Sequence, residues 1–201
     1  MVTEIKTKKK EKRQKRIAWG ITGSGDRLVE TVEIMKEVKK QYQHDVDIMV
    51  YLSKAGDLVV KYYKLADCLK GNFDRIRVEI DANTPFLAGQ LQLGKFEFLL
   101  IAPATSNTVA KISTGMADTL LCNAAIMGLK GFVPVYIMPS DYKEGTIVTK
   151  LPNGRNHKLR IRKEDAEHVK ELAAMEDVFI LEKPEEIYQV FKKHFRHEKS
   201  S

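Results

Sequence analysis

The amino-acid sequence predicts an α/β protein built on a doubly wound, mostly parallel sheet. Short hydrophobic runs typical of buried strands alternate with segments whose apolar residues recur at helical spacing. Small polar residues follow several of these runs, where a strand turns into a helix. Strands that alternate with helices pair in parallel through right-handed crossovers. We therefore expect a Rossmann-like (flavodoxin-like) three-layer sandwich, which ends in a C-terminal β-hairpin and helices.

Five hydrophobic segments are the expected strands of the parallel sheet. In the third, polar and apolar residues alternate, which favours a position nearer a sheet edge. The fourth stops just before Pro103. The expected strands cover residues 16–22, 46–52, 75–80, 96–101 and 132–138.

Amphipathic segments between these strands are the expected helices. The clearest has apolar residues between Leu28 and Val38, and Asn83-Thr84-Pro85 is a helix-start signal with proline in the first turn. The expected helices cover residues 28–38, 58–63, 83–93, a segment from 105 to about 115, and 117–127.

The C-terminal part has a different pattern. Residues 145–150 and 157–161 flank Pro152-Asn153-Gly154, and an Asn-Gly pair is a strong hairpin signal. A helix over 164–175, a short strand over 178–181 and a terminal helix over 184–195 complete the prediction. The sequence shows no repeat or low-complexity linker, so we expect a single domain over 16–195.

Length and composition favour a globular protein. The chain has 201 residues, of which 43% are hydrophobic and 30% charged. No apolar run reaches the roughly 18 residues of a membrane span, and no signal-peptide core is present, so a cytoplasmic location without membrane contact is expected. The two cysteines, Cys68 and Cys122, are too few to ligate an iron–sulfur cluster, and no histidine spacing indicates a metal site.

The net charge of +7 is concentrated at the N-terminus. Residues 1–16 carry eight Lys or Arg side chains against Glu4 and Glu11, which leaves the remaining chain nearly neutral. We expect residues 1–15 to form a disordered basic tail and 196–201 a short C-terminal tail. Nucleic acid or an acidic protein could bind such an arm, but the near-neutral body argues against a nucleic-acid function.

Three turns after expected strands carry small polar residues that suit an anionic ligand. They are Thr22-Gly23-Ser24-Gly25, Ser53, and the stretch Pro103-Ala104-Thr105-Ser106-Asn107-Thr108. Backbone N–H groups at a helix start, together with the helix dipole, attract anions. The carboxyl ends of parallel strands share one edge, so the three turns should converge on one crevice. The alternative is that they are ordinary helix caps.

The first turn distinguishes between kinds of phosphate ligand. It lacks the GxGxxG spacing of a dinucleotide fold and the lysine of a GxxxxGK[ST] loop. A single phosphate, held by Ser24, neighbouring amides and Ser53, fits this turn better.

These residues resemble the FMN-binding flavoprotein family, which includes the cysteine decarboxylases and the flavin prenyltransferases. The resemblance covers about residues 16–140, and the Pro-Ala-Thr-Ser-Asn-Thr segment with Gly115-Met116-Ala117-Asp118 is its most specific part. It implies non-covalent FMN and a homo-oligomer, either a trimer or a dodecamer, whose contact the Gly115–Asp118 turn supports. The residues that it places around FMN are Thr22, Gly23, Ser24, Gly25, Ser53, Pro103, Ala104, Thr105, Ser106, Asn107 and Thr108.

Two departures point away from the decarboxylase branch. Gly89-Gln90 stands where a decarboxylase histidine is expected, and Met138-Pro139-Ser140-Asp141-Tyr142 replaces a substrate-clamp motif. The Arg-Glu pair of the prenyltransferases is also absent. The sequence therefore does not favour decarboxylase or prenyltransferase activity.

The chain is more similar to archaeal flavoproteins that include dihydromethanopterin reductase (acceptor). Trp19-Gly20-Ile-Thr-Gly and the hairpin around Leu151-Pro-Asn-Gly154 carry this resemblance. It implies electron transfer from ferredoxin or another iron–sulfur protein through FMN to a pterin such as dihydromethanopterin. A pure electron carrier and a flavin-binding module without catalysis are the alternatives.

Four residues have specific expected roles within this hypothesis. The resemblance places Asn107 near flavin N5 as the candidate catalytic residue, and the alternative is that Asn107 only caps its helix. Lys158, Arg160 and Arg162 alternate, so on a strand they share one face that could dock an acidic ferredoxin, or could simply be a charged, solvated edge. His194 and His197 are expected to be solvated.

Overall fold

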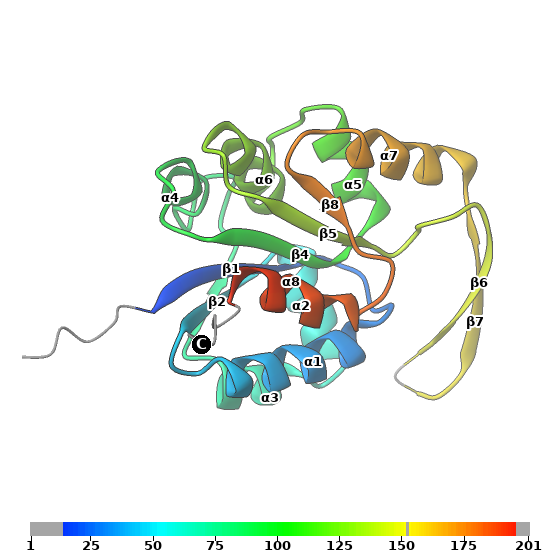
Figure 1. The fold of residues 1–201 in the computed structure, drawn as a ribbon. Coiled ribbons are helices and arrows are strands. Elements are labelled where there is room, and N and C mark those ends of the chain that lie inside the picture. The colour runs from blue at the N-terminus through cyan, green and yellow to red at the C-terminus, as the bar shows by residue number, and fades with distance from the viewer. Residues whose placement is uncertain (1–13, 152, 196–201) are drawn as a thin grey trace, which may run out of the picture.

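The computed structural model describes residues 14–151 and 153–195, which form a parallel sheet between two helical layers (Figure 1). The strands are β1 Lys15–Ile21, β2 Val46–Leu52, β3 Arg75–Val78, β4 Phe98–Ala104, β5 Val135–Pro139, β6 Gly145–Lys150, β7 Asn156–Ile161 and β8 Val178–Ile180. The helices are α1 Leu28–Gln41, α2 Lys54–Tyr62, α3 Ala66–Asn72, α4 Ala88–Gln92, α5 Ser106–Ser113, α6 Leu120–Lys130, α7 Lys163–Ala173 and α8 Glu186–His194.

The six strands of the main sheet have the order β3-β2-β1-β4-β5-β8, and every pair is parallel. The chain moves outward from β1 to β3 and then returns to place β4 on the other side of β1. The strand order therefore switches between β1 and β4, where open α/β sheets bind their ligands. The doubly wound α/β prediction is confirmed.

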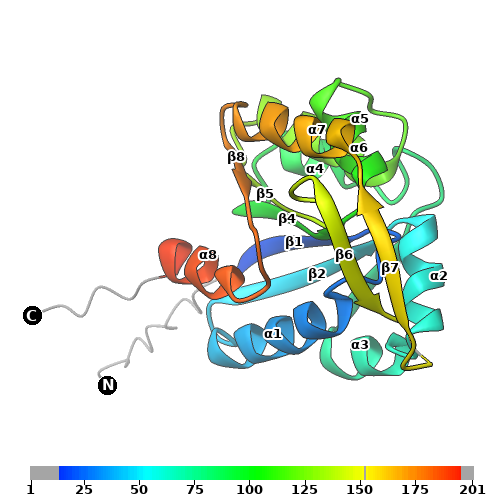
Figure 2. The same ribbon diagram turned by 90° about the vertical axis from the view of Figure 1, so that its right-hand side faces the viewer.

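Each face of the sheet has its own apolar core. Side chains alternate along β1, so Ile17 and Trp19 pack with α1, α3 and α8, whereas Ala18 packs with α4, α5, α6 and α7. The central strands β1 and β4 are buried almost throughout, as expected for strands covered on both faces. Figures 1 and 2 show the same two helical layers.

The expected helix start at Asn83-Thr84-Pro85 is wrong. The Asp81 carboxylate accepts hydrogen bonds from the amides of Asn83 (2.8 Å) and Thr84 (2.9 Å), which holds this segment as a turn. Helix α4 begins only at Ala88 and ends at Gln92, so it is half the expected length.

The fourth strand does not stop before Pro103. Strand β4 continues to Ala104, although proline has no N–H to donate. The register against β5 shifts between Ile101 and Ala104, so the missing donor falls within an irregularity of the ladder. The Pro103 carbonyl points across to β1, where it accepts from Thr22.

Other boundaries differ because single residues take the left-handed conformation. Lys64 has φ 57° and separates α2 from α3, a helix that the sequence analysis missed. Phe132, with φ 57°, lies before β5, which starts at Val135 rather than at 132. The expected edge position of the third strand is confirmed, although β3 ends at Val78.

The predicted hairpin forms and lies in front of the carboxyl edge of the sheet (Figure 2). Strands β6 and β7 pair only with each other, with Ile147 opposite Leu159. Pro152 of the turn signal and most of the basic N-terminal segment lie outside the described residues. Among the residues that are described, no helix has the length and apolarity needed to traverse a bilayer.

Candidate functional site

The three predicted loops meet at the carboxyl ends of β1, β2 and β4. The Thr22 hydroxyl donates to the Pro103 carbonyl (2.9 Å) and accepts from the Thr105 amide (2.8 Å). The Ser53 amide donates to the Ile21 carbonyl (3.0 Å), which brings the β2 loop to the same place. The expected convergence of these loops at the switch in strand order is therefore present in this chain.

Close backbone packing explains the small residues in these loops. A Cβ atom on Gly56 would lie 2.3 Å from the Ile21 carbonyl oxygen, and one on Gly23 would lie 2.7 Å from the Cβ of Ala55. Both glycines are required by the approach of the β1 loop to the start of α2.

The start of α1 offers unpaired backbone donors. Helix α1 has no side-chain cap, and within the described residues the amides of Gly23, Ser24 and Gly25 have no intramolecular acceptor. The Ser24 hydroxyl accepts from the Asp26 amide (3.2 Å) and from the Ser140 hydroxyl (2.5 Å). This arrangement suits the oxygens of a phosphate group.

The caps of α2 and α5 are side chains from the same loops. Ser53 Oγ accepts from the Gly56 amide (2.9 Å), and Thr105 Oγ1 accepts from the Thr108 amide (3.3 Å). The Ser53 hydroxyl keeps its own proton for a further acceptor, whereas Thr105 Oγ1 also shares a hydrogen bond of 3.1 Å with Thr108 Oγ1. Asn107 lies inside α5 with an exposed side chain, so the alternative that Asn107 is the helix cap is wrong. Its role near a flavin stays a prediction.

A fourth loop, after β5, joins the site and was missed by the sequence analysis. Ser140 donates to Ser24, its amide donates to the Ala104 carbonyl (2.9 Å), and the Ser106 hydroxyl donates to the Asp141 carboxylate. The sequence signal for this loop is the pair Ser140-Asp141, which closely follows the expected strand over 132–138. In the sequence alone, this segment stands out only as a departure from a substrate-clamp motif.

Two carboxylates border the loops. Burial raises the pKa of Asp26, and the neighbouring carboxylates Glu30 and Asp141 add to this, although Arg27 opposes it. The almost fully buried Glu79 accepts from the Lys54 amide (3.0 Å) at the start of α2 and from the Leu120 amide (2.9 Å) at the start of α6. Glu79 therefore satisfies orphan donors of two helices at once.

The basic hairpin residues do not all share a strand face. Lys158 and Arg160 lie exposed on β7, whereas Arg162 follows the strand as the residue before α7. Arg162 forms an ion pair with Asp165 (2.6 Å), which lowers the pKa of that carboxyl. The expectation of three residues on one strand face is thus corrected to two.

His194 is not a solvated residue. Its ring is half-buried, lies against Phe98 and shares a hydrogen bond of 3.0 Å with the Tyr136 hydroxyl. Burial lowers the pKa of His194. His197 lies outside the described residues.

Comparison with known proteins now identifies the family. The Flavoprotein family model matches residues 5–192. The chain belongs to the Flavoprotein family. The resemblance inferred from the Pro-Ala-Thr-Ser-Asn-Thr segment is thereby confirmed.

Two curated relatives come from Methanocaldococcus jannaschii. The uncharacterized protein MJ0730 is 52% identical over 179 residues, which cover 89% of this chain and 95% of that protein. A dihydromethanopterin reductase (acceptor) is 31% identical over 236 residues, with 88% of this chain and 95% of that protein covered.

Among solved structures, DmrB of Burkholderia xenovorans in complex with FMN is similar over most of its length. It is 29% identical, has a TM-score of 0.75, and the match covers 90% of this chain and 96% of that chain. It is described as a cubic protein cage for redox transfer. The FMN in that structure agrees with the cofactor expected from the sequence.

The loops of this chain fit FMN by their own chemistry. Open amides at Gly23–Gly25 and hydroxyls at Ser24 and Ser53 suit one phosphate. The hydroxyls of Ser106 and Thr108 are bonded to Asp141 and Thr105, so these two residues keep the loop small and polar. The loop after β1 has neither the GxGxxG spacing of a dinucleotide fold nor the lysine of a GxxxxGK[ST] loop.

Proposed function

We propose that this chain is an FMN-dependent oxidoreductase that accepts electrons from ferredoxin or a similar iron–sulfur protein and reduces dihydromethanopterin or a related pterin. The observation that carries the proposal is the convergence of the β1, β2 and β4 loops, tied together by Thr22, at the switch in strand order. The reductase named among the relatives supports the reaction class.

The residues around the loops have distinct proposed tasks. FMN, when bound, supplies storage for two electrons and their delivery to the pterin as hydride. Gly23, Ser24 and Ser53 hold its phosphate, and the residues from Thr105 to Thr108 line the ribityl chain and ring. Asn107 is the candidate for a contact near N5, because its exposed side chain is free of the helix cap.

A separate iron–sulfur protein is the proposed electron donor. The chain has two cysteines, too few to ligate an iron–sulfur cluster, and one of them, Cys122, is a buried residue of α6. Lys158 and Arg160 on the exposed hairpin are the proposed docking residues for an acidic ferredoxin. We further propose a homo-oligomer, either a trimer or a dodecamer, which the cage described for DmrB supports. The proposed location is cytoplasmic.

One assay separates this function from a pure electron carrier. The FMN-loaded protein is reduced with dithionite or ferredoxin without oxygen, and dihydromethanopterin is then added. Reoxidation of the flavin with formation of the tetrahydro product is the expected result. Reoxidation only by a second flavoprotein would indicate the carrier, and a chain that cannot bind FMN would contradict both.

A further inference from the structure

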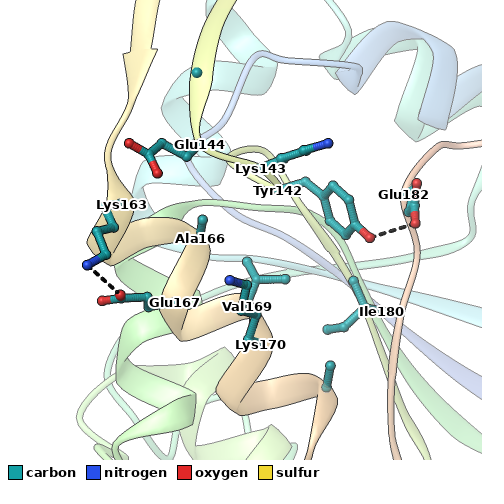
Figure 3. Close-up of a pocket in the computed structure, with 12 residues that line it drawn as sticks. Tyr142, Lys143, Glu144, Lys163, Ala166, Glu167, Val169, Lys170, Ile180 and Glu182 are labelled. Carbon is teal, nitrogen blue, oxygen red and sulfur yellow. Dashed lines mark hydrogen bonds and ion pairs between the residues drawn. The ribbon is translucent and has the colours of Figure 1, made fainter.

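Two cavities differ in their relation to the loops assigned to FMN, which are residues 22–25, 53 and 103–108. The larger has a volume of about 920 Å³ and lies between α7 and the loop after β5, and none of those described residues lines it (Figure 3). Its charged side chains are three lysines and three glutamates, so they balance. The smaller, of about 570 Å³, lies between the start of α1, the end of α2 and the hairpin, and Gly25 forms part of its wall. The smaller cavity therefore borders the amides that suit a phosphate.

A tyrosine at the end of α2 packs on this glycine. A Cβ atom at Gly25 would lie 2.5 Å from Cζ of Tyr63 and closer still to its hydroxyl oxygen, so the approach depends on the absence of a side chain at position 25. The N and Cβ atoms of one residue are about 2.5 Å apart, which places Tyr63 Oη within about 5 Å of the Gly25 nitrogen. Hydrogen bonds of about 2.9 Å from the amide and about 2.7 Å from the hydroxyl span that gap, so one phosphate group can accept both.

The end of α2 fixes the position of Tyr63. Its amide donates to the Val59 carbonyl (2.9 Å), and the left-handed residue Lys64 ends the helical turn directly after it. The Tyr63 ring is partly buried against the apolar core on the α1 face of the sheet. Its neighbour Tyr62 is 60% exposed and does not line the cavity. The helix end therefore directs one of two adjacent tyrosines to the phosphate loop.

The cavity wall favours neutral donors over net charge as the means of holding a phosphate. Its charged side chains are Arg27 and Lys64 against Asp26 and Glu30, so they also balance. Arg27 is already engaged by Asp26 (3.5 Å). Burial raises the pKa of Tyr63, and neighbouring acidic groups raise it further, so its hydroxyl keeps the proton at neutral pH. An uncharged hydroxyl donor is thus present beside the open amides.

We propose that Tyr63 is a further ligand of the FMN phosphate. Its hydroxyl donates to the phosphate group that the Gly23–Gly25 amides bind, so donors from the β1 loop, from Ser53 and from the end of α2 surround one phosphate. Tyr63 thereby favours FMN over riboflavin, which has the same ring system without the phosphate. This inference rests on the proposed function, because it adds a residue to the site of the proposed cofactor.

The test measures equilibrium binding of FMN and of riboflavin to the full chain freed of flavin, by fluorescence titration. Tyr63→Phe removes the hydroxyl and keeps the ring. Tyr62→Phe is the matched control, because it removes the same group from the exposed neighbour. A second measurement, independent of affinity, is the phosphorus-31 resonance of bound FMN in each chain.

Tyr63→Phe should weaken FMN binding by about tenfold, since it removes a hydrogen bond to a charged group. Riboflavin affinity should stay within about twofold of that of the unaltered chain, because the lost contact is to the phosphate alone. Tyr62→Phe should change neither affinity. The phosphorus resonance of bound FMN should shift in Tyr63→Phe and not in Tyr62→Phe.

Two outcomes would overturn the assignment of Tyr63. One is unchanged FMN affinity with an unchanged phosphorus resonance in Tyr63→Phe, and the other is an equal loss of FMN and riboflavin, which indicates a structural role. Failure of the unaltered chain to bind FMN contradicts the proposed function itself. If the unaltered chain binds FMN and reduces the pterin while Tyr63→Phe has no effect, only this inference fails. Thermal melting without flavin checks that each variant is folded.

Discussion

Thr22 and Thr105 are joined by a hydrogen bond of 2.8 Å from the Thr105 amide to the Thr22 hydroxyl. The two residues are far apart in the sequence, and each follows one of the two strands that flank the switch in strand order. The same hydroxyl donates to Pro103, so Thr22 uses both its donor and an acceptor site while it is 2% exposed. This one side chain fixes the spacing of the two loops that we assign to the flavin.

Replacing Thr22 with valine should weaken both the fold and the site. The substitution keeps the shape but leaves the part-buried Thr105 amide without an acceptor, which costs about 1–3 kcal/mol. The Pro103 carbonyl still accepts from the Thr22 backbone amide (3.2 Å). Thr22→Val should therefore lower the free energy of unfolding by this amount and reduce FMN affinity, as measured by denaturation and by flavin titration. Thr22→Ser retains the hydroxyl and should behave nearly as the unaltered chain. Equal stability of both variants would contradict this account.

A negative charge at position 24 should expel FMN. Ser24→Asp places a carboxylate beside the proposed phosphate position, next to Asp26, whose pKa burial already raises. Repulsion should reduce affinity at least about tenfold. The measurement is the flavin-to-protein absorbance ratio after dialysis, with Ser24→Ala as the uncharged control. Full flavin occupancy in Ser24→Asp would show that the phosphate binds elsewhere.

Charge reversal on the hairpin should slow the reaction with ferredoxin. The double variant Lys158→Glu/Arg160→Glu should reduce the rate of ferredoxin-driven flavin reduction about tenfold at low salt, because steering of an acidic partner is lost. The difference should shrink as ionic strength rises. Reduction by dithionite serves as the internal control and should not change. A ferredoxin rate that is unaffected at low salt would remove these residues from the interface.

The contact of α8 with the sheet should weaken in acid through His194. Burial, aided by Lys193 and Lys15 and opposed by Glu97, lowers the pKa of His194 below its ordinary 6.5. The unfolded chain therefore takes up a proton before the folded chain does as the pH falls. The contribution of His194 to stability is complete above pH 6.5 and declines below it, by at most about 1.4 kcal/mol per pH unit.

The control for this pH effect is His194→Gln. Glutamine can still bond to the Tyr136 hydroxyl but does not titrate. Its unfolding free energy should lack the decline that the unaltered chain shows from pH 6.5 downward. If both chains respond to pH in the same way, other groups cause the acid sensitivity.

Local patterns predicted the sheet well because its strands and helices carry strong periodic signals. Trp19, Leu100 and Ile137 lie in runs that read as buried strands, and all three are buried in the sheet. The sequence also placed Thr22, Ser53 and Thr105 at strand ends, and parallel pairing alone then predicted their convergence.

What the sequence could not show depends on contacts between distant residues. The Asp81 carboxylate competes for the amides that a helix would have used near Pro85, so the helix start fails. Lys64 and Phe132 adopt left-handed conformations that their residue types rarely take, so α3 was missed and the start of β5 was placed too early. Ser140 joins the site only through Ser24, a partner on another strand.

Glu79 limits how many anions this edge of the sheet can accept. Its carboxylate already neutralises the positive ends of α2 and α6, through the amides of Lys54 and Leu120. Ser53 caps α2 and Thr105 caps α5, whereas α1 has no side-chain cap. The chain thus supplies its own anion at the starts of α2 and α6. The start of α1 remains for one ligand phosphate, and a second phosphate of a dinucleotide would meet the Glu79 carboxylate.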